Sequence, residues 1–240
     1  MLLKVLFAVC FVASLILTPL YLEAQKNKGL KSLTLKMLDS NCFLGAGILA
    51  VFITDNQTPF AKYMIIALAM SWNGDFLLHV IKPKFLNAVG FVSFMVAHVF
   101  YIIAYNTAAQ SIEPGRAFLQ WWGFAIPVVC LIVYAIFIIK KMDFIKLGIF
   151  ASIAYGFVIL IMFAKAADLA VLSLQSGTEN AVISAILLFA GATLFVASDF
   201  TISFLIFDQR FKKNYPLKIF NIATYFAGQL LLASLILTVR

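Results

Sequence analysis

Eight long apolar runs dominate the sequence and restrict its fold more than any other feature. They cover about residues 3–22, 35–54, 60–80, 85–105, 118–139, 146–167, 182–207 and 218–239. An α-helix needs roughly 20 apolar residues to cross the hydrocarbon core of a bilayer, and it satisfies its own backbone hydrogen bonds, which lipid cannot do. The sequence therefore predicts an all-α, polytopic membrane helix bundle with eight transmembrane helices. We expect residues 1–240 to form a single transmembrane domain.

Composition excludes a soluble fold. The chain is 64% hydrophobic and 12% charged, with a mean hydropathy of +1.03, whereas a typical soluble domain is about 25% charged. The net charge of +8 is spread over short clusters between the apolar runs, so it does not indicate a nucleic-acid partner. We expect a multi-pass protein of a bacterial cytoplasmic (inner) membrane, with the lipid bilayer as its surroundings.

Successive connections between the apolar runs alternate between many and few basic residues. The connections after the first, third, fifth and seventh runs hold most of the 18 basic residues: Lys26, Lys28, Lys31, Lys36, Lys82, Lys84, Lys140, Lys141, Lys146, Arg210, Lys212, Lys213 and Lys218. The positive-inside rule places these connections in the cytoplasm and both termini outside. A cleaved signal peptide over residues 1–24 is the alternative. The single Lys4 before a long apolar run favours a retained first helix.

Two of the ten acidic residues, Asp75 and Asp199, lie well inside apolar runs. An aspartate near the centre of a membrane helix costs about 2.5–3.5 kcal/mol on insertion scales. At 1.5 Å per residue both lie roughly three-quarters of the way toward the cytoplasmic ends of their helices. Pairing, protonation or solvation must offset this cost, and such residues usually serve a function. We therefore interpret the two aspartates as a functional pair.

Other polar side chains are expected at a similar depth, where they would form a polar chamber open to the cytoplasmic leaflet. They are Asp39, Ser40, Asn41, Ser71, Asn73, Tyr155, Ser198, Tyr225 and Gln229, with Lys36 at the cytoplasmic mouth. The alternative, strongest for the serines, is that such groups only join helices. His98 falls in the outer half of its run, where it is either a substrate-binding residue or a packed, hydrogen-bonded histidine. With two histidines in the chain, a three-histidine zinc site cannot form, and we expect no metal or other cofactor.

The two aspartates also indicate an internal duplication. The segments "MSWNGDFLLHV" (70–80) and "LFVASDFTISF" (194–204) are similar and lie four runs apart, on helices of the same orientation. The first and last four helices are therefore predicted to form two parallel repeats around an axis along the membrane normal.

Four segments resemble the YhhN-like family of multi-pass membrane proteins, which includes lysoplasmalogenases. They are "SWNGDFLL" (71–78), "FVSFMVAHVFYIIAY" (91–105), "GATLFVASDF" (191–200) and "TYFAGQLLLA" (224–233). The chain departs from the family near the start of the second run, where a Lys-Pro pair is frequent and Lys31-Ser32 or Lys36-Met37 stands instead. It also departs at Gly228, where a bulkier residue is usual. The resemblance implies an intramembrane hydrolase that cleaves the vinyl ether bond of lysoplasmalogen to a fatty aldehyde and a glycerophospho-ethanolamine or -choline.

The chemistry that this resemblance implies needs two carboxyl groups. A general acid protonates the β-carbon of the vinyl ether, and a second carboxylate stabilises the resulting cation and activates water, as in glycosidases. Asp75 and Asp199 are the expected catalytic residues. Tyr225 and Gln229 would orient water or the ether oxygen, and Lys36 would either meet the lipid phosphate or serve only as a topology charge. Neither the identity of the acid nor the oligomeric state follows from the sequence.

Two other functions remain open. A proton-coupled transporter of small molecules or lipids would use the same carboxylate pair. A packing or receptor protein would need no chemistry. The placement of both aspartates on one side of the midplane favours the hydrolase.

Overall fold

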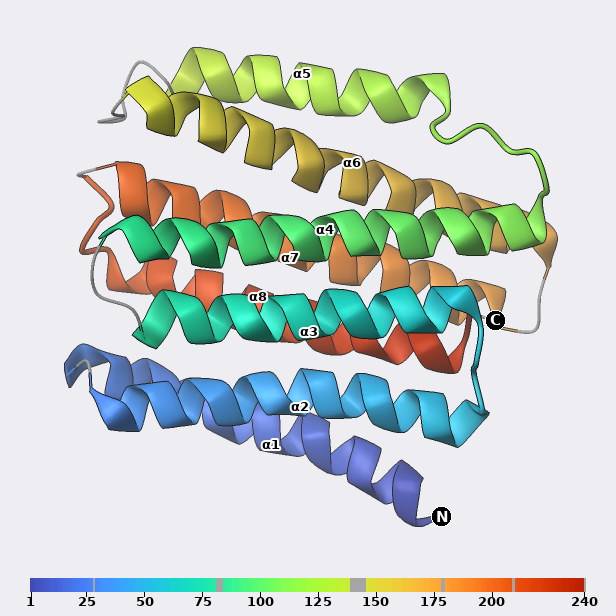
Figure 1. Ribbon diagram of the computed structural model, residues 1–240, viewed down its shortest axis with the longest axis horizontal. Helices are drawn as coiled ribbons and strands as arrows, with labels where there is room; N and C mark the ends of the chain where they lie inside the picture. Colours follow the sequence, from blue (N-terminus) through green and yellow to red (C-terminus); the bar gives the residue numbers. More distant parts are fainter. Residues whose placement is uncertain (28, 81–83, 139–145, 178–179, 209, 240) are drawn as a thin grey trace.

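The computed structural model describes residues 1–27, 29–80, 84–138, 146–177, 180–208 and 210–239, and these ranges are all-helical (Figure 1). The eight α-helices are α1 (Leu2–Ala24), α2 (Leu30–Thr54), α3 (Pro59–Val80), α4 (Lys84–Ile112), α5 (Trp121–Ile138), α6 (Lys146–Ser176), α7 (Ala181–Phe207) and α8 (Tyr215–Ser234). Two short 3-10 turns follow α1 and α8. The predicted all-α class is confirmed.

Six of the described helices are long and apolar enough to cross a membrane: α1, α2, α4, α6, α7 and α8. The apolar part of α5, Trp121–Val133, is shorter, and α3 carries Lys62 and Asp75 in its span. That all eight helices cross the bilayer therefore stays a prediction.

Both chain termini lie at one end of the bundle (Figure 1). The α2–α3, α4–α5 and α6–α7 connections lie at this same end, and the basic α1–α2 and α7–α8 connections lie at the other. The described basic connections thus lie at one end of the bundle and those with few basic residues at the other, as the charge pattern predicts. The orientation of the bundle in a membrane remains a prediction. Four of the basic residues on which that prediction depends lie outside the described residues: Lys28, Lys82, Lys140 and Lys141.

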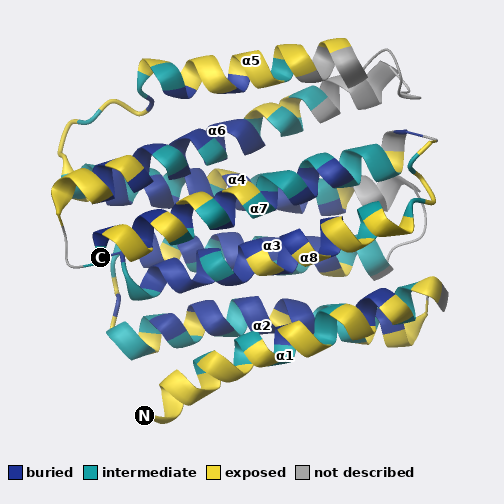
Figure 2. Cartoon of the chain, turned by 180° about the vertical axis from the view of Figure 1, so that it is seen from behind, coloured by how far each residue is buried: buried dark blue, intermediate teal, exposed yellow. Residues whose placement is uncertain are grey.

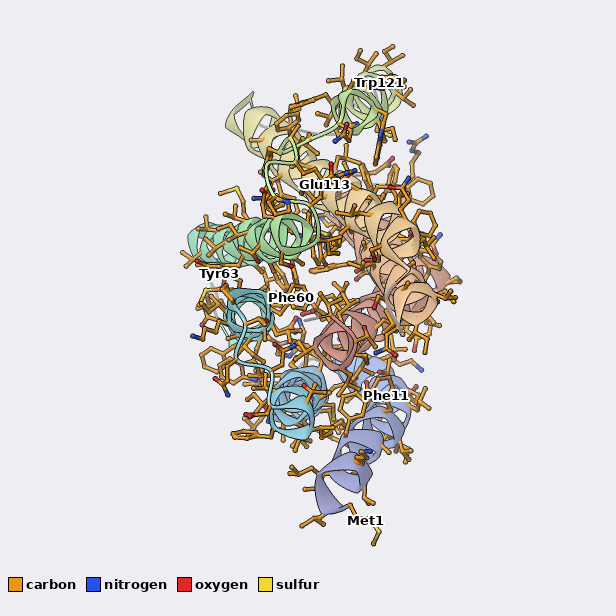
Figure 3. All side chains as sticks on the ribbon, turned by 90° about the vertical axis from the view of Figure 1, so that its right-hand side faces the viewer. Met1, Phe11, Phe60, Tyr63, Glu113 and Trp121 are labelled. Atoms are coloured by element: carbon orange, nitrogen blue, oxygen red, sulfur yellow. The ribbon has the colours of Figure 1, made fainter. Side chains whose placement is uncertain are left out.

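Six helices form the body of the bundle, and α1 and α5 lie at opposite edges of it, as the positions of Met1 and Trp121 show (Figure 3). Within the body, α3 packs on α2 and α4, α6 on α4 and α7, and α8 on α7 and α2. The edge helix α1 contacts α2 and α8, and α5 contacts α6. Exposed residues are frequent on both edge helices (Figure 2), where apolar side chains such as Val12 and Trp121 face outward.

The packing order supports the predicted duplication, which remains a prediction. The contacts α1–α2, α2–α3, α3–α4 and α4–α6 correspond to α5–α6, α6–α7, α7–α8 and α8–α2. Asp75 and Asp199 then occupy the equivalent helices α3 and α7. Tyr101 and Tyr225 are separated by the same number of residues as the two aspartates and lie on the equivalent helices α4 and α8.

Two helices continue by more than one turn past the C-terminal ends of the apolar runs that predicted them. Helix α6 continues past residue 167 to Ser176 because Lys165 and Asp168, three residues apart on one face, form an ion pair at 3.5 Å. It ends before Gly177, whose φ of +61° suits a glycine. Helix α4 continues to Ile112, which places His98 at the middle of the helix.

Helix α8 approaches helix α7 closely because Gly228 has no side chain. A Cβ atom at Gly228 would lie 3.0 Å from the backbone nitrogen of Phe195 and 3.1 Å from the carbonyl oxygen of Gly191. Neither backbone atom can rotate away. The glycine thus allows the contact that places Tyr225 of α8 near the residues of α7.

This contact predicts that Gly228→Ala destabilises the protein. Overpacking at a close contact costs typically about 1–3 kcal/mol, so thermal unfolding in detergent, followed by circular dichroism, should occur at a lower temperature. Gly45→Ala is the matched control, because the nearest atom to its new Cβ is Cys10 Sγ at 3.7 Å. Equal melting temperatures for the two variants would contradict the close approach of α7 and α8.

Candidate active site

Asp75 is the centre of a buried polar cluster formed by three helices. Its side chain is 2% exposed, and the Lys36 Nζ atom of α2 lies 2.8 Å from Oδ1. The Ser40 hydroxyl of α2 and the Tyr225 hydroxyl of α8 each donate a hydrogen bond of 2.7 Å to Oδ2. Lys36 and Ser40 are four residues apart and so lie on the same face of α2. Both carboxyl oxygens are occupied by donors, one of them an ammonium group, which suits a carboxylate anion.

Asp199 forms a second cluster with different partners. The Nε2 atom of His98 in α4 lies 2.8 Å from Oδ2, and the Tyr155 hydroxyl of α6 donates to the same oxygen at 3.2 Å. Within the described parts of the chain, Oδ1 has no hydrogen-bond partner. Asp199 is 9% exposed, whereas His98 is completely buried. The second carboxyl group is therefore held by one oxygen only.

One aromatic ring lies between the two clusters. The centroid of Phe195 is 4.6 Å from that of His98 and 5.8 Å from that of Tyr225. No hydrogen bond joins Asp75 to Asp199 among the residues that the structure describes. The Asp75 and Asp199 clusters thus lie on either side of an aromatic layer formed by Phe195, and the two carboxyl groups do not share a proton.

The remaining predicted residues contact neighbours of the two clusters. Gln229, one turn after Tyr225, accepts a hydrogen bond of 2.7 Å from the Tyr101 hydroxyl. Asn73 donates to Ser93 Oγ at 3.0 Å, which joins α3 to α4. Ser198 Oγ accepts from Asn221 at 2.9 Å, which joins α7 to α8. The described contacts of Asn73 and Ser198 therefore serve helix packing, while Gln229 extends the polar region beside Tyr225.

Several contacts were not anticipated from the sequence. His98 was expected to be a packed histidine away from Asp75, and its bond to Asp199 of α7 was not foreseen. Lys36 was expected at the membrane surface or on a lipid phosphate, yet its side chain is 13% exposed and paired with Asp75. Ser40 is one of the polar residues predicted at this depth, and its hydroxyl reaches Asp75. Asp39 is also buried, where Ser14 and Thr18 of α1 donate to it at 2.5 and 2.7 Å.

A third charged cluster lies at the opposite end of the bundle. Arg116, in the connection between α4 and α5, donates to both oxygens of Asp168 at 2.8 and 3.3 Å. The hydrogen bond to Asp168 is the main cause of a raised pKa of Arg116. Lys165 lies beside Asp168 and over the ring of Phe118. These contacts hold the connection onto α6 and satisfy two charges that are buried in an apolar helix.

The ion pair at Asp75 predicts a large effect of Lys36→Met. The substitution leaves a buried carboxyl group without its cation, and removing one partner of a buried pair costs about 3–5 kcal/mol. Thermal unfolding in detergent should therefore shift strongly downward. Lys26→Met is the matched control, because Lys26 is an exposed lysine paired with exposed Glu23.

The double variant Lys36→Met/Asp75→Asn tests the pairing itself. It should regain much of the stability lost in Lys36→Met, because no charge then remains buried. If the double variant instead loses as much stability as Lys36→Met and Asp75→Asn lose together, Lys36 and Asp75 do not interact.

Comparisons with known proteins agree with this architecture. The model of the YhhN family matches residues 32–236, a range that contains both aspartate clusters. A Dictyostelium discoideum protein described as a lysoplasmalogenase homolog is 34% identical over 105 residues, which are 43% of this chain and 32% of that protein. The match thus spans about a third of the relative's length. No solved structure matches the chain. Because the family match extends over most of the sequence and all of the site, this chain is an integral membrane protein of the YhhN family.

Proposed function

We propose that this protein is an intramembrane hydrolase that cleaves the vinyl ether bond of lysoplasmalogen. The products are a fatty aldehyde and a glycerophospho-ethanolamine or -choline. One observation carries the proposal: two buried aspartates, each bound by a basic side chain, flank a single aromatic layer. The description of the Dictyostelium relative as a lysoplasmalogenase homolog supports the same activity.

The carboxyl groups match what the reaction requires. Protonation of the β-carbon turns a vinyl ether into an oxocarbenium ion, to which water adds before the hemiacetal collapses. An enzyme therefore needs one group that gives a proton and one negative charge that stabilises the cation, as glycosidases do with two carboxyl groups. Asp75 and Asp199 are two carboxyl groups with visibly different partners, and such pairs divide acid and anion roles.

The position of Asp75 suits a lipid that has a single chain. Asp75 lies little more than one turn before α3 ends at Val80, roughly 8 Å from the helix end at 1.5 Å per residue. The vinyl ether of a lysoplasmalogen is adjacent to its glycerol, so it also lies close to the membrane surface. Phe43 and Phe94 pack edge-on against Tyr225 at 6.1 and 5.9 Å, so the surroundings of the Asp75 cluster are apolar and aromatic.

The remaining features of the proposal concern the membrane. The basic ends of the helices near Asp75 face the cytoplasm, both termini lie outside, and the substrate enters from the cytoplasmic leaflet of a bacterial inner membrane. Tyr225 and Gln229 orient water or the ether oxygen in a polar chamber at this end of the bundle. Lys36 holds Asp75 and lies on the side from which the lipid phosphate arrives.

The proposal predicts aldehyde release by the purified protein in detergent. Lysoplasmalogen should yield a fatty aldehyde, whereas the ester lysolipid with the same chain length should not. Asp75→Asn and Asp199→Asn should each reduce kcat at least about 100-fold, the usual contribution of an acid or base group. Asp55→Asn is the matched control, because Asp55 is exposed at the end of α2 with a φ of +49°, which asparagine tolerates.

Two results would contradict this function. Full activity in both Asp75→Asn and Asp199→Asn would exclude the carboxyl mechanism. Proton-coupled uptake by vesicles that contain the protein, without aldehyde release, would instead support the transporter.

A further inference from the structure

The two carboxyl groups use their oxygens differently. Asp75 has Lys36 on Oδ1 and two hydroxyl donors on Oδ2, and its side chain is 2% exposed. Asp199 receives both of its contacts on Oδ2, and Oδ1 has no partner among the described residues. Asp199 is also the more exposed of the two, at 9%. Only Asp199 therefore has an oxygen available to a substrate.

From this asymmetry we infer that Asp199 is the proton donor of the reaction and that Oδ1 is the atom that delivers the proton. His98 and Tyr155 are positioning residues that act through Asp199. Asp75 is the fixed anion that stabilises the cationic intermediate. This inference rests on the proposed function and assigns the two roles within it.

The bonds at Oδ2 decide where the acidic proton resides. When His98 Nε2–H and the Tyr155 hydroxyl both donate to Oδ2, the proton of the carboxylic acid is on Oδ1. The second ring nitrogen of His98, Nδ1, is buried and has no hydrogen-bond partner. An imidazolium ion would leave an N–H donor buried there without an acceptor, which is costly. The geometry thus suits a neutral imidazole with its proton on Nε2.

The contrast with Asp75 follows from the partner's charge. A lysine ammonium group favours the anionic form of a neighbouring carboxyl group. A neutral imidazole gives a hydrogen bond without a full positive charge. Among the residues that the structure describes, the groups that contact His98 from other helices are Asp199 and Phe195 of α7 and Tyr155 of α6, and none of these three is a cation.

Asp199 gives a proton to the substrate and regains one from water, so it is unchanged at the end of the reaction. Oδ1–H gives its proton to the β-carbon, where the electrons of the C=C bond form the new C–H bond, and an oxygen lone pair forms the oxocarbenium C=O bond. Water adds to the oxocarbenium carbon, and the proton that it releases returns to Oδ1. The hemiacetal then breaks its bond to the glycerol oxygen, which takes up the hydroxyl proton as the aldehyde forms. One water molecule is consumed and Asp199 regains its proton.

The first test needs no substrate. An apolar carbodiimide such as dicyclohexylcarbodiimide reacts with a protonated carboxyl group, whose proton moves to a carbodiimide nitrogen while the carboxyl oxygen bonds to the central carbon. Peptide mass spectrometry of the whole protein in detergent should find the adduct on Asp199. The adduct should persist in Asp75→Asn and disappear in Asp199→Asn. An adduct on Asp75, or none on Asp199, would overturn the inference even if the protein acts on another lipid.

The second test uses the pH dependence of aldehyde release. Tyr155→Phe removes one hydrogen bond to the carboxylate form of Asp199, so the alkaline fall in kcat/KM should move to higher pH by roughly 0.5–1 unit. Ser40→Ala and Tyr225→Phe change only the contacts of Asp75 and should lower the rate without moving this limb. Movement of the limb in those two variants but not in Tyr155→Phe would make Asp75 the donor.

Substitutions at His98 separate positioning from packing. His98→Gln keeps an N–H donor that can reach Oδ2, so it should retain at least tenfold more activity than His98→Leu. Equal activities in two variants with the same melting temperature would show that the hydrogen bond to Asp199 has no role. Absence of aldehyde release by the unmodified protein would refute the proposed function, and the carbodiimide experiment would still test the protonation of Asp199.

Discussion

The cost of placing a carboxyl group among apolar helices governs the arrangement of this protein. Asp75 is stable there only because an ammonium group and two hydroxyl groups reach it. These donors come from α2 and α8, so the same contacts that offset the desolvation of Asp75 also hold α2, α3 and α8 together. Gly228 extends the constraint to α7, because it lets the backbones of α7 and α8 approach at the level of Phe195. The polar cluster and the packing of the bundle therefore depend on each other.

The second aspartate meets the same constraint in another way. Asp199 is bonded to an imidazole and a phenol, and one of its oxygens has no partner among the described residues. If the bundle arose by duplication, the equivalent tyrosines have diverged, because Tyr225 donates to Asp75 whereas Tyr101 donates to Gln229. A difference of this kind gives two carboxyl groups on equivalent helices different chemistry. Acid and anion roles require such a difference.

Local sequence properties predicted the helices well and their ends less well. Apolar runs identify membrane helices because composition and length alone decide whether a segment can enter lipid. The predicted sixth run ends at residue 167, beside Lys165 and Asp168. The helix continues to Ser176 because these charges pair with each other and with Arg116. Arg116 lies in a distant connection, so no local pattern could reveal that compensation.

The sequence by itself determined the membrane class, the order of the helices, the family and the two aspartates inside apolar runs, because each of these depends on composition, run length or short motifs. Tertiary structure alone decided that Lys36 reaches Asp75, that His98 reaches Asp199, and that Phe195 lies between the two clusters. In a soluble helix the alternation of polar and apolar residues shows which face is buried. In a membrane helix both the lipid-facing and the buried faces are apolar. Which way a polar side chain points is therefore settled only when the neighbouring helices are in place.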